Sequence, residues 1–219
     1  MKITKTITAV CIACLTIFVT GCQTTIAPAY DYTALNSEKP KSILVLPPTN
    51  NTVDVTATYS YLSTVSQPIA EKGYYVFPVS VIDSFLKENG LPTPAEMNAI
   101  PLDKISEHIG ADAVLYVNIT DWGQKYVLLS SKTVARGQLQ LVSTKTGNLL
   151  WDAHFNFEQA SDSGGNGLVG ALVNAVVTQI IGSINDQTPQ IARVANNIAF
   201  NQKNRGLLPG PYYVAPERK

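Results

Sequence analysis

The sequence predicts a single α/β domain on a mixed sheet, in the order βαβα, then a β-meander, then two C-terminal helices packed on the sheet. Residues 126–142 and 149–157 alternate polar and apolar side chains around a turn at residues 144–148, which is typical of an antiparallel hairpin. Two segments, 168–184 and 190–200, supply the final helices. Three continuous apolar runs predict buried strands: residues 42–46, 74–77 and 113–119.

The first half of the predicted domain alternates strands with helices. The run at residues 42–46 ends at Pro47 and Pro48, because proline cannot donate into the ladder of a central strand. From about Tyr61 apolar residues recur at helical spacing up to a cap at Gly73, with Pro68 inside the pattern, so this helix is expected to start late or to kink. Two further helices are marked by apolar positions: Val81, Ile82, Phe85 and Leu86 in one, and Leu102, Ile105 and Ile109 in the other.

The first 22 residues have the pattern of a secretory signal. Lys2 and Lys5 precede an uncharged, mostly apolar stretch at residues 7–19, and Gly21 stands directly before Cys22. The ending resembles the lipobox of bacterial lipoproteins, in which the signal is cleaved before a cysteine that is diacylated and often receives a third chain such as palmitate. We therefore expect a signal peptide at 1–21, a lipid-anchored tether at 22–40, the α/β domain at 41–204 and a tail rich in Pro and Gly at 205–219.

Cleavage there leaves 219 − 21 = 198 residues, enough for one domain with its own core. Cys11 and Cys14 leave with the signal, so no internal disulfide is expected in the exported chain. The chain has 16 basic and 16 acidic residues, and losing Lys2 and Lys5 leaves 14 against 16. This balance argues against nucleic-acid binding. Gln23 follows the cysteine where an acidic residue often signals inner-membrane retention, so an outer-membrane location facing the periplasm is expected.

Several segments of the domain resemble a family of bacterial lipoproteins of unassigned function, typified by a lipoprotein surface antigen of a pathogenic coccus. These segments occur in the family's order over nearly the whole mature chain: residues 42–50, 61–68, 71–79, 110–116 and 205–212. The resemblance implies an outer-membrane lipoprotein whose domain is like the N-terminal domain of TolB. It also implies a neighbouring channel lipoprotein of the curli-secretion (CsgG) type as a partner. The family has no known catalytic residues, so none is transferred.

Two glycine-containing motifs are reminiscent of enzymes. Residues 161–165 are similar to the sequence around the nucleophile of trypsin-like proteases, but only His108 and His154 are available as a base, and the α/β fold is not theirs. Residues 165–170 match the dinucleotide fingerprint, with Asp186 downstream, yet the required βαβ unit is missing. We interpret both motifs as parts of a flexible polar loop and helix entry.

Other signs of catalysis are weak. There is no Walker lysine motif and no histidine pair at metal-ligand spacing, so no metal or cofactor is expected. The remaining acidic candidates are spread over a helix and two strand ends, where solvated faces are the commoner explanation: Asp103, Glu107, Asp112 and Asp121. The sequence therefore does not predict an enzyme.

The most informative functional stretch is the charge-free segment at residues 168–184. A fully apolar helix is usually core, and about 17 residues are at the lower limit for spanning a bilayer. Its small residues at four-residue spacing also permit close contact with another backbone, which makes it a candidate interface: Gly167, Gly170, Ala171, Asn174, Ala175, Thr178 and Gly182. Further contact candidates are the tyrosines of the tether and tail: Tyr30, Tyr32, Tyr212 and Tyr213.

These observations favour a non-enzymatic docking module in an envelope or secretion-channel assembly. It would be held to the outer membrane by its lipid and would contact a CsgG-type lipoprotein or a second copy. The alternative is a protein that binds a small ligand or a cell-wall glycan. Its cleft would lie at the carboxyl ends of the strands at 43–46 and 74–77, where open α/β sheets bind ligands.

Overall fold

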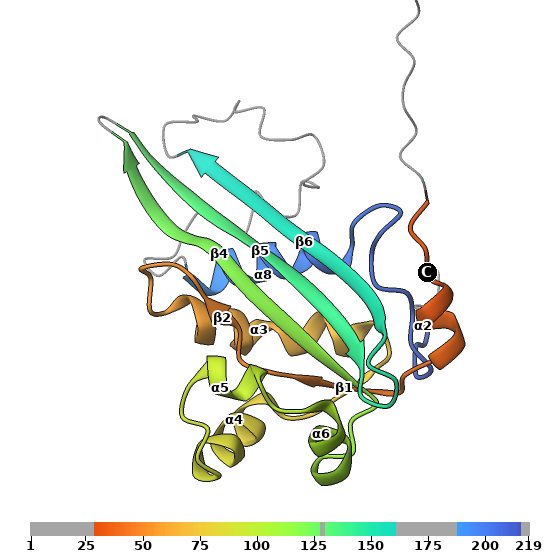
Figure 1. The fold of residues 1–219 in the computed structure, drawn as a ribbon. Coiled ribbons are helices and arrows are strands. Elements are labelled where there is room, and N and C mark those ends of the chain that lie inside the picture. Colours follow the sequence, from red (N-terminus) through yellow and green to blue (C-terminus); the bar gives the residue numbers. More distant parts are fainter. Residues whose placement is uncertain (1–28, 128–129, 161–187, 216–219) are drawn as a thin grey trace, which may run out of the picture.

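A computed structural model describes residues 29–127, 130–160 and 188–215 (Figure 1). The chain forms one mixed sheet with strand order β3-β1-β4-β5-β6, and β2 pairs with β4. The predicted α/β class with a mixed sheet is confirmed. The elements in chain order are α2 (Thr33–Glu38), β1 (Ser42–Val45), β2 (Thr49–Asn50), α3 (Ala57–Glu71), β3 (Tyr75–Val76), α4 (Val79–Glu88), α5 (Pro94–Asn98), α6 (Leu102–His108), β4 (Ala113–Val127), β5 (Ser130–Ser143), β6 (Leu149–Ala160) and α8 (Thr188–Phe200).

Strand β1 lies at the centre of the parallel half of the sheet. It pairs in parallel with β3, where Ile43 faces Val76, and with β4, where Ile43 faces Ala113. Ile43 and Val45 point into one core, whereas Leu44 and Leu46 point into a second core on the opposite face. Successive side chains of a strand point to opposite faces, so a continuous apolar run satisfies both cores at once.

The two cores are closed by different sets of helices. In Figure 1, α3 and α8 lie behind the meander and cover one face of the sheet. This first core is filled by large side chains that include Tyr61, Trp122, Trp151, Phe155 and Phe200. The second core is smaller and lies under α4, α5 and α6: Leu44, Leu46, Ile82, Leu86, Met97, Ile105, Ala111 and Val114.

Strands β4, β5 and β6 form the predicted antiparallel meander. Leu141 of β5 faces Leu115 of β4 and Trp151 of β6, and all three side chains are buried in the first core. The alternate positions Gln138, Gln140, His154 and Asn156 are exposed on the other face. This is the alternation expected of a sheet with one face in the core and one in water.

Some elements differ from the sequence prediction. Helix α3 begins at Ala57 rather than near Tyr61 and runs through Pro68 to Glu71. Helix α2 lies inside the segment predicted as a tether, where its one buried side chain, Leu35, packs into the first core. Helix α5 was not predicted, although Thr93 and Glu96 form a complete capping box at its start.

The tail crosses the surface at the end of α3. The backbone N–H groups of Gly210 and Tyr212 donate to the carbonyl oxygens of Lys72 and Gly73, at 2.7 and 3.0 Å. The Tyr74 hydroxyl donates to the Leu208 carbonyl at 3.0 Å, and Leu207 is buried. The tail is therefore fastened to the turn between α3 and β3.

We expect Gly73→Ala to destabilise the domain more than Gly90→Ala. Both glycines follow a helix at similar positive φ, +81° and +86°, so alanine costs about 1 kcal/mol of backbone strain at either site. A Cβ at Gly73 would also overlap the backbone of Tyr213, whereas nothing lies within 4 Å of one at Gly90. In urea unfolding, the free energy of unfolding should fall by about 2 kcal/mol or more beyond the decrease caused by Gly90→Ala. Equal losses would mean that the tail does not pack there.

Candidate functional site

Several of the residues singled out by sequence lie outside the described residues. This holds for Cys22, for the motifs around residues 161–170 and for Asp186. It also holds for the candidate interface: Gly167, Gly170, Ala171, Asn174, Ala175, Thr178 and Gly182. These predictions remain predictions. The tyrosines of the tether and tail lie within the described residues: Tyr30, Tyr32, Tyr212 and Tyr213.

The two histidines lie on separate elements. His108 is the last residue of α6, with its side chain about 60% exposed, and its Nε2 is 3.8 Å from Glu107. His154 is exposed on β6, where its register partner is Gln138. Of the acidic candidates, Asp103 and Glu107 share α6, whereas Asp112 lies directly before β4 and Asp121 lies within it. In the described ranges no three His, Cys, Asp or Glu side chains are grouped to hold a metal ion.

The other carboxylates have structural partners. Asp121 pairs with Lys125 and Arg136, each at 2.9 Å, on the outer face of the meander. Glu107 pairs with Lys104 at 2.7 Å. Asp112 accepts the backbone N–H groups of Lys41 and Ser42 at 2.9 and 3.2 Å. Asp112 therefore holds the start of β1 against the start of β4, a role that the expectation of a solvated face did not include.

The expected ligand cleft is filled at the carboxyl end of β1. Pro47 and Pro48 are buried there. The Asn98 side-chain amide of α5 donates to the Pro47 carbonyl at 2.8 Å, and the Thr58 hydroxyl of α3 donates to the Pro48 carbonyl at 3.2 Å. Packed backbone occupies this end of the strand, so the position predicted for a ligand is closed at β1.

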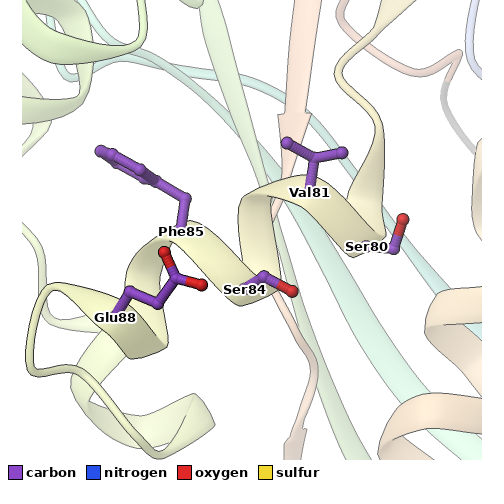
Figure 2. A pocket seen from close by; sticks show the side chains of 5 residues that line it. All are labelled: Ser80, Val81, Ser84, Phe85 and Glu88. Carbon is purple, nitrogen blue, oxygen red and sulfur yellow. The ribbon is translucent and has the colours of Figure 1, made fainter.

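A shallow hollow lies on the outer side of α4 (Figure 2). Ile82 and Leu86 anchor the helix in the second core. The hollow lies on the solvent side of α4 and has a volume of about 460 Å³. It is lined by Ser80, Val81, Ser84, Phe85 and Glu88. Val81 and Phe85 are large apolar residues that remain 61% and 43% exposed. They are four residues apart and therefore neighbours along one side of the helix.

Tyr59 of α3 lies on the other flank of α4 and is 43% exposed. The Lys87 ammonium nitrogen is 4.9 Å from its ring centroid and 2.7 Å from Asp83 Oδ2. The hydrogen bond to Asp83 raises the pKa of Lys87. The small side chains of Ser80 and Ser84 lie between this flank and the apolar one. We call the set of Tyr59 and the five hollow-lining residues the α4 surface.

A second constellation joins the two ends of the described chain. The Tyr30 hydroxyl donates to Asp152 Oδ1 at 2.8 Å and accepts the Asp152 backbone N–H at 2.9 Å. Arg205 from the tail pairs with the same carboxylate, and its guanidinium carbon is 4.8 Å from the Tyr30 ring centroid. The Tyr32 hydroxyl donates to the Gly206 carbonyl at 2.6 Å. Burial and the bond to Asp152 raise the pKa of Tyr30 to about 12. We call these residues the terminal clasp.

We expect Asp152→Ala to loosen the terminal clasp. The substitution leaves the Tyr30 hydroxyl and the Arg205 guanidinium without their shared acceptor. Because hydrogen bonds to a charged group are lost, the free energy of unfolding should fall by about 1–3 kcal/mol. Urea unfolding measures the loss. Glu158→Ala is the matched control, because Glu158 is an acidic residue on the same face of β6 and pairs only with surface cations. A loss no larger than that of the control would show that the clasp does not stabilise the domain.

We expect the contribution of Asp112 to depend on pH. Partial burial raises the pKa of its carboxyl, but hydrogen bonds from Lys41 and Ser42 outweigh this and hold the pKa below its usual 3.8. The ionised Asp112 carboxylate therefore stabilises the domain above about pH 4, and this stabilisation is lost as the pH falls through the pKa of the folded state. Asp112→Asn should destabilise the domain at pH 7, with the deficit shrinking between pH 5 and pH 2 in urea unfolding. A deficit that stays constant would contradict this.

Among the described helices none is long and apolar enough to span a bilayer.

Comparisons with known proteins agree with the resemblance seen in the sequence. A protein of Neisseria meningitidis serogroup B named "Putative lipoprotein NMB1124/NMB1162" is 38% identical over 200 residues, covering 91% of this chain and 93% of that one. The crystal structure of lipoprotein GNA1162 from Neisseria meningitidis is 39% identical with a TM-score of 0.56, covering 66% of this chain and all of that one.

A weaker likeness is to the LpoB C-terminal domain from Salmonella enterica, which is 20% identical with a TM-score of 0.41. It covers 54% of this chain and 83% of that one. Residues 30–212 match the family described as "Putative lipoprotein GNA1162-like", and this range contains every element from α2 to α8. The chain belongs to the GNA1162-like lipoprotein family.

Proposed function

We propose that this protein is an outer-membrane lipoprotein, anchored through Cys22, whose domain is a non-enzymatic docking module in an envelope or secretion-channel assembly. Membership of a lipoprotein family supports a lipid anchor. The lipobox-like ending at Cys22 supports the attachment site, and Gln23 after it supports the outer membrane with the domain in the periplasm. Several acyl chains on one residue provide firm anchoring, because each buried methylene contributes about 0.8 kcal/mol.

The observation that carries the docking role is the α4 surface (Figure 2). Single exposed apolar residues are ordinary, but Val81 and Phe85 line one hollow and are neighbours along the helix. Tyr59 adds an aromatic ring on the opposite flank. The small serines between the apolar and aromatic flanks leave room for a protruding partner side chain. Aromatic residues are enriched in protein interfaces.

The partner is a CsgG-type channel lipoprotein or a second copy of this chain. The family resemblance supports the first, and the small-residue stripe supports close helix–helix contact in either case. That stripe remains part of the proposed interface: Gly167, Gly170, Ala171, Asn174, Ala175, Thr178 and Gly182.

A second candidate function is binding of a small ligand or cell-wall glycan on the same α4 surface. Three of the five residues lining the hollow are polar, Ser80, Ser84 and Glu88, and they supply hydroxyl and carboxylate groups suited to sugar hydroxyls. Ligand sites usually enclose most of their ligand, whereas this hollow is open to solvent. Docking of a protein therefore fits it better.

Replacing Val81 and Phe85 together by serine should abolish assembly without unfolding the domain. Both side chains are exposed, so the stability change should be small, whereas an interface that buries them loses about 1.5–3 kcal/mol for each. The native mass of the lipidated protein, released mildly from its envelope after light crosslinking, reports the complex. We expect at least about a tenfold decrease in the complexed fraction.

The matched control is replacement of Gln138 and Gln140 by serine, on the exposed face of β5. This control should leave the complex intact. A complex that survives the Val81 and Phe85 replacement would overturn the docking role of the α4 surface. If the double replacement of Val81 and Phe85 abolishes glycan binding and leaves the assembly unchanged, the second candidate function is favoured.

A further inference from the structure

The chain between the lipidation site and the folded domain is short. Ala29 is the first described residue, and 29 − 22 = 7 peptide steps separate it from Cys22. Seven fully extended steps span at most about 25 Å. A globular chain of this size has a radius of gyration of about 16 Å and so a diameter of about 40 Å. We call residues 22–29 the leash. Because the leash is shorter than the domain is wide, the part of the domain that carries Ala29 must stay close to the bilayer.

The terminal clasp fixes where the leash leaves the domain. Tyr30, the residue after Ala29, is held by two hydrogen bonds to Asp152 and by the Arg205 guanidinium over its ring. Tyr32 is held to the tail through the Gly206 carbonyl. The leash therefore cannot lengthen by peeling α2 from the domain unless these contacts break.

The leash leaves from the end of the sheet at which the parallel strands begin. After α2 the chain passes Lys41, whose carbonyl accepts the Tyr75 backbone N–H at 3.0 Å. Tyr75 starts β3, and the preceding Gly73 lies against the backbone of Tyr213. Helix α2, the first residues of β1 and β3, and the tail thus share one end of the molecule, at the right of Figure 1. The loop between β2 and α3, which contains Val53, lies at the opposite side of the molecule, at the left of Figure 1.

The surface of this end is rich in exposed tyrosine. The exposed fractions are 52% for Tyr75, 60% for Tyr212, 42% for Tyr213 and 85% for Val214. Tyrosine is enriched where membrane meets water, because its ring is apolar and its hydroxyl stays hydrated. Among the described residues, acidic and basic groups at this end are intermixed and form no basic patch: Asp31, Glu38, Lys39, Lys41, Lys72, Asp112, Lys145, Asp152 and Arg205.

We infer that this end, defined by Tyr75, Tyr212, Tyr213 and Val214, rests on the bilayer with its tyrosines among the lipid headgroups. The inference rests on the proposed lipidation of Cys22. The ligand is the headgroup layer of the membrane that carries the anchor, and the intermixed charges make the contact insensitive to anionic lipid. The loop that contains Val53 then points away from the membrane into the periplasm, toward partners.

The test compares two exposed valines at opposite ends of the lipidated, full mature chain. A fluorophore is placed on a single new cysteine, Val214→Cys in one variant and Val53→Cys in the other, which are 85% and 93% exposed in the native protein. Each protein is inserted in phosphatidylethanolamine vesicles carrying a nitroxide on a fraction of the headgroups. We expect at least about threefold stronger quenching at position 214 than at 53. Equal quenching would overturn the orientation.

A second variant tests the tyrosines themselves. Replacing Tyr212 and Tyr213 by serine in the Val214→Cys protein should lower its quenching toward the level of position 53, and unchanged quenching would overturn their role. Including phosphatidylglycerol should leave all values unchanged, and a strong dependence on it would contradict the headgroup contact through tyrosine. Flotation separates the two proposals. Protein that does not float with vesicles and retains a free Cys22 thiol contradicts the anchor, whereas protein that floats with equal quenching at both valines contradicts only the orientation.

Discussion

The burial of β1 on both faces is the constraint on which the rest of the structure depends. Four consecutive residues, Ile43 to Leu46, are each no more than 1% exposed, and they alternate between the two cores. Each such side chain contributes about 1.5–3 kcal/mol when fully buried. Helices α3 and α8 pack on one of these cores and α4 to α6 on the other, and β1 with its neighbour β4 supplies side chains to both cores. Pro47 and Pro48 are buried just beyond β1 and occupy the part of the expected ligand cleft that lies at this strand.

This arrangement leaves function to the periphery. The two ends of the described chain are fastened to each other and to β6 by the terminal clasp, which would connect the proposed lipid anchor directly to the folded domain. The outer side of α4 remains uncovered and carries apolar side chains that the second core does not need. A module tethered at one end and presenting such a surface elsewhere is suited to holding a partner near a membrane.

The parts of the fold that depend on local pattern could be predicted from the sequence. The apolar run of β1, the turn between β5 and β6, and Pro189 at the start of α8 each carry their own signal. Helix α2 could not be predicted, because its stability comes from burying Leu35 in a core assembled from distant segments. Propensity is a weak guide where tertiary contacts decide.

The candidate site was harder to predict for two physical reasons. Tyr30 and Asp152 are separated by 122 residues, and no single-sequence pattern relates them. On α4 the adjacent pairs Val81–Ile82 and Phe85–Leu86 are equally apolar, so periodicity alone does not tell which member faces the core. The structure buries Ile82 and Leu86 and exposes the other two.

The central claim is that a lipid on Cys22 holds this domain at the outer membrane. Intact-mass and peptide spectrometry of the protein purified from its own outer membrane tests it most directly. The account predicts a chain that begins at Cys22 and carries a diacylglyceryl group, with or without a further acyl chain on its amino group. A chain that retains residues 1–21, or one that begins elsewhere with an unmodified Cys22 thiol, would contradict it.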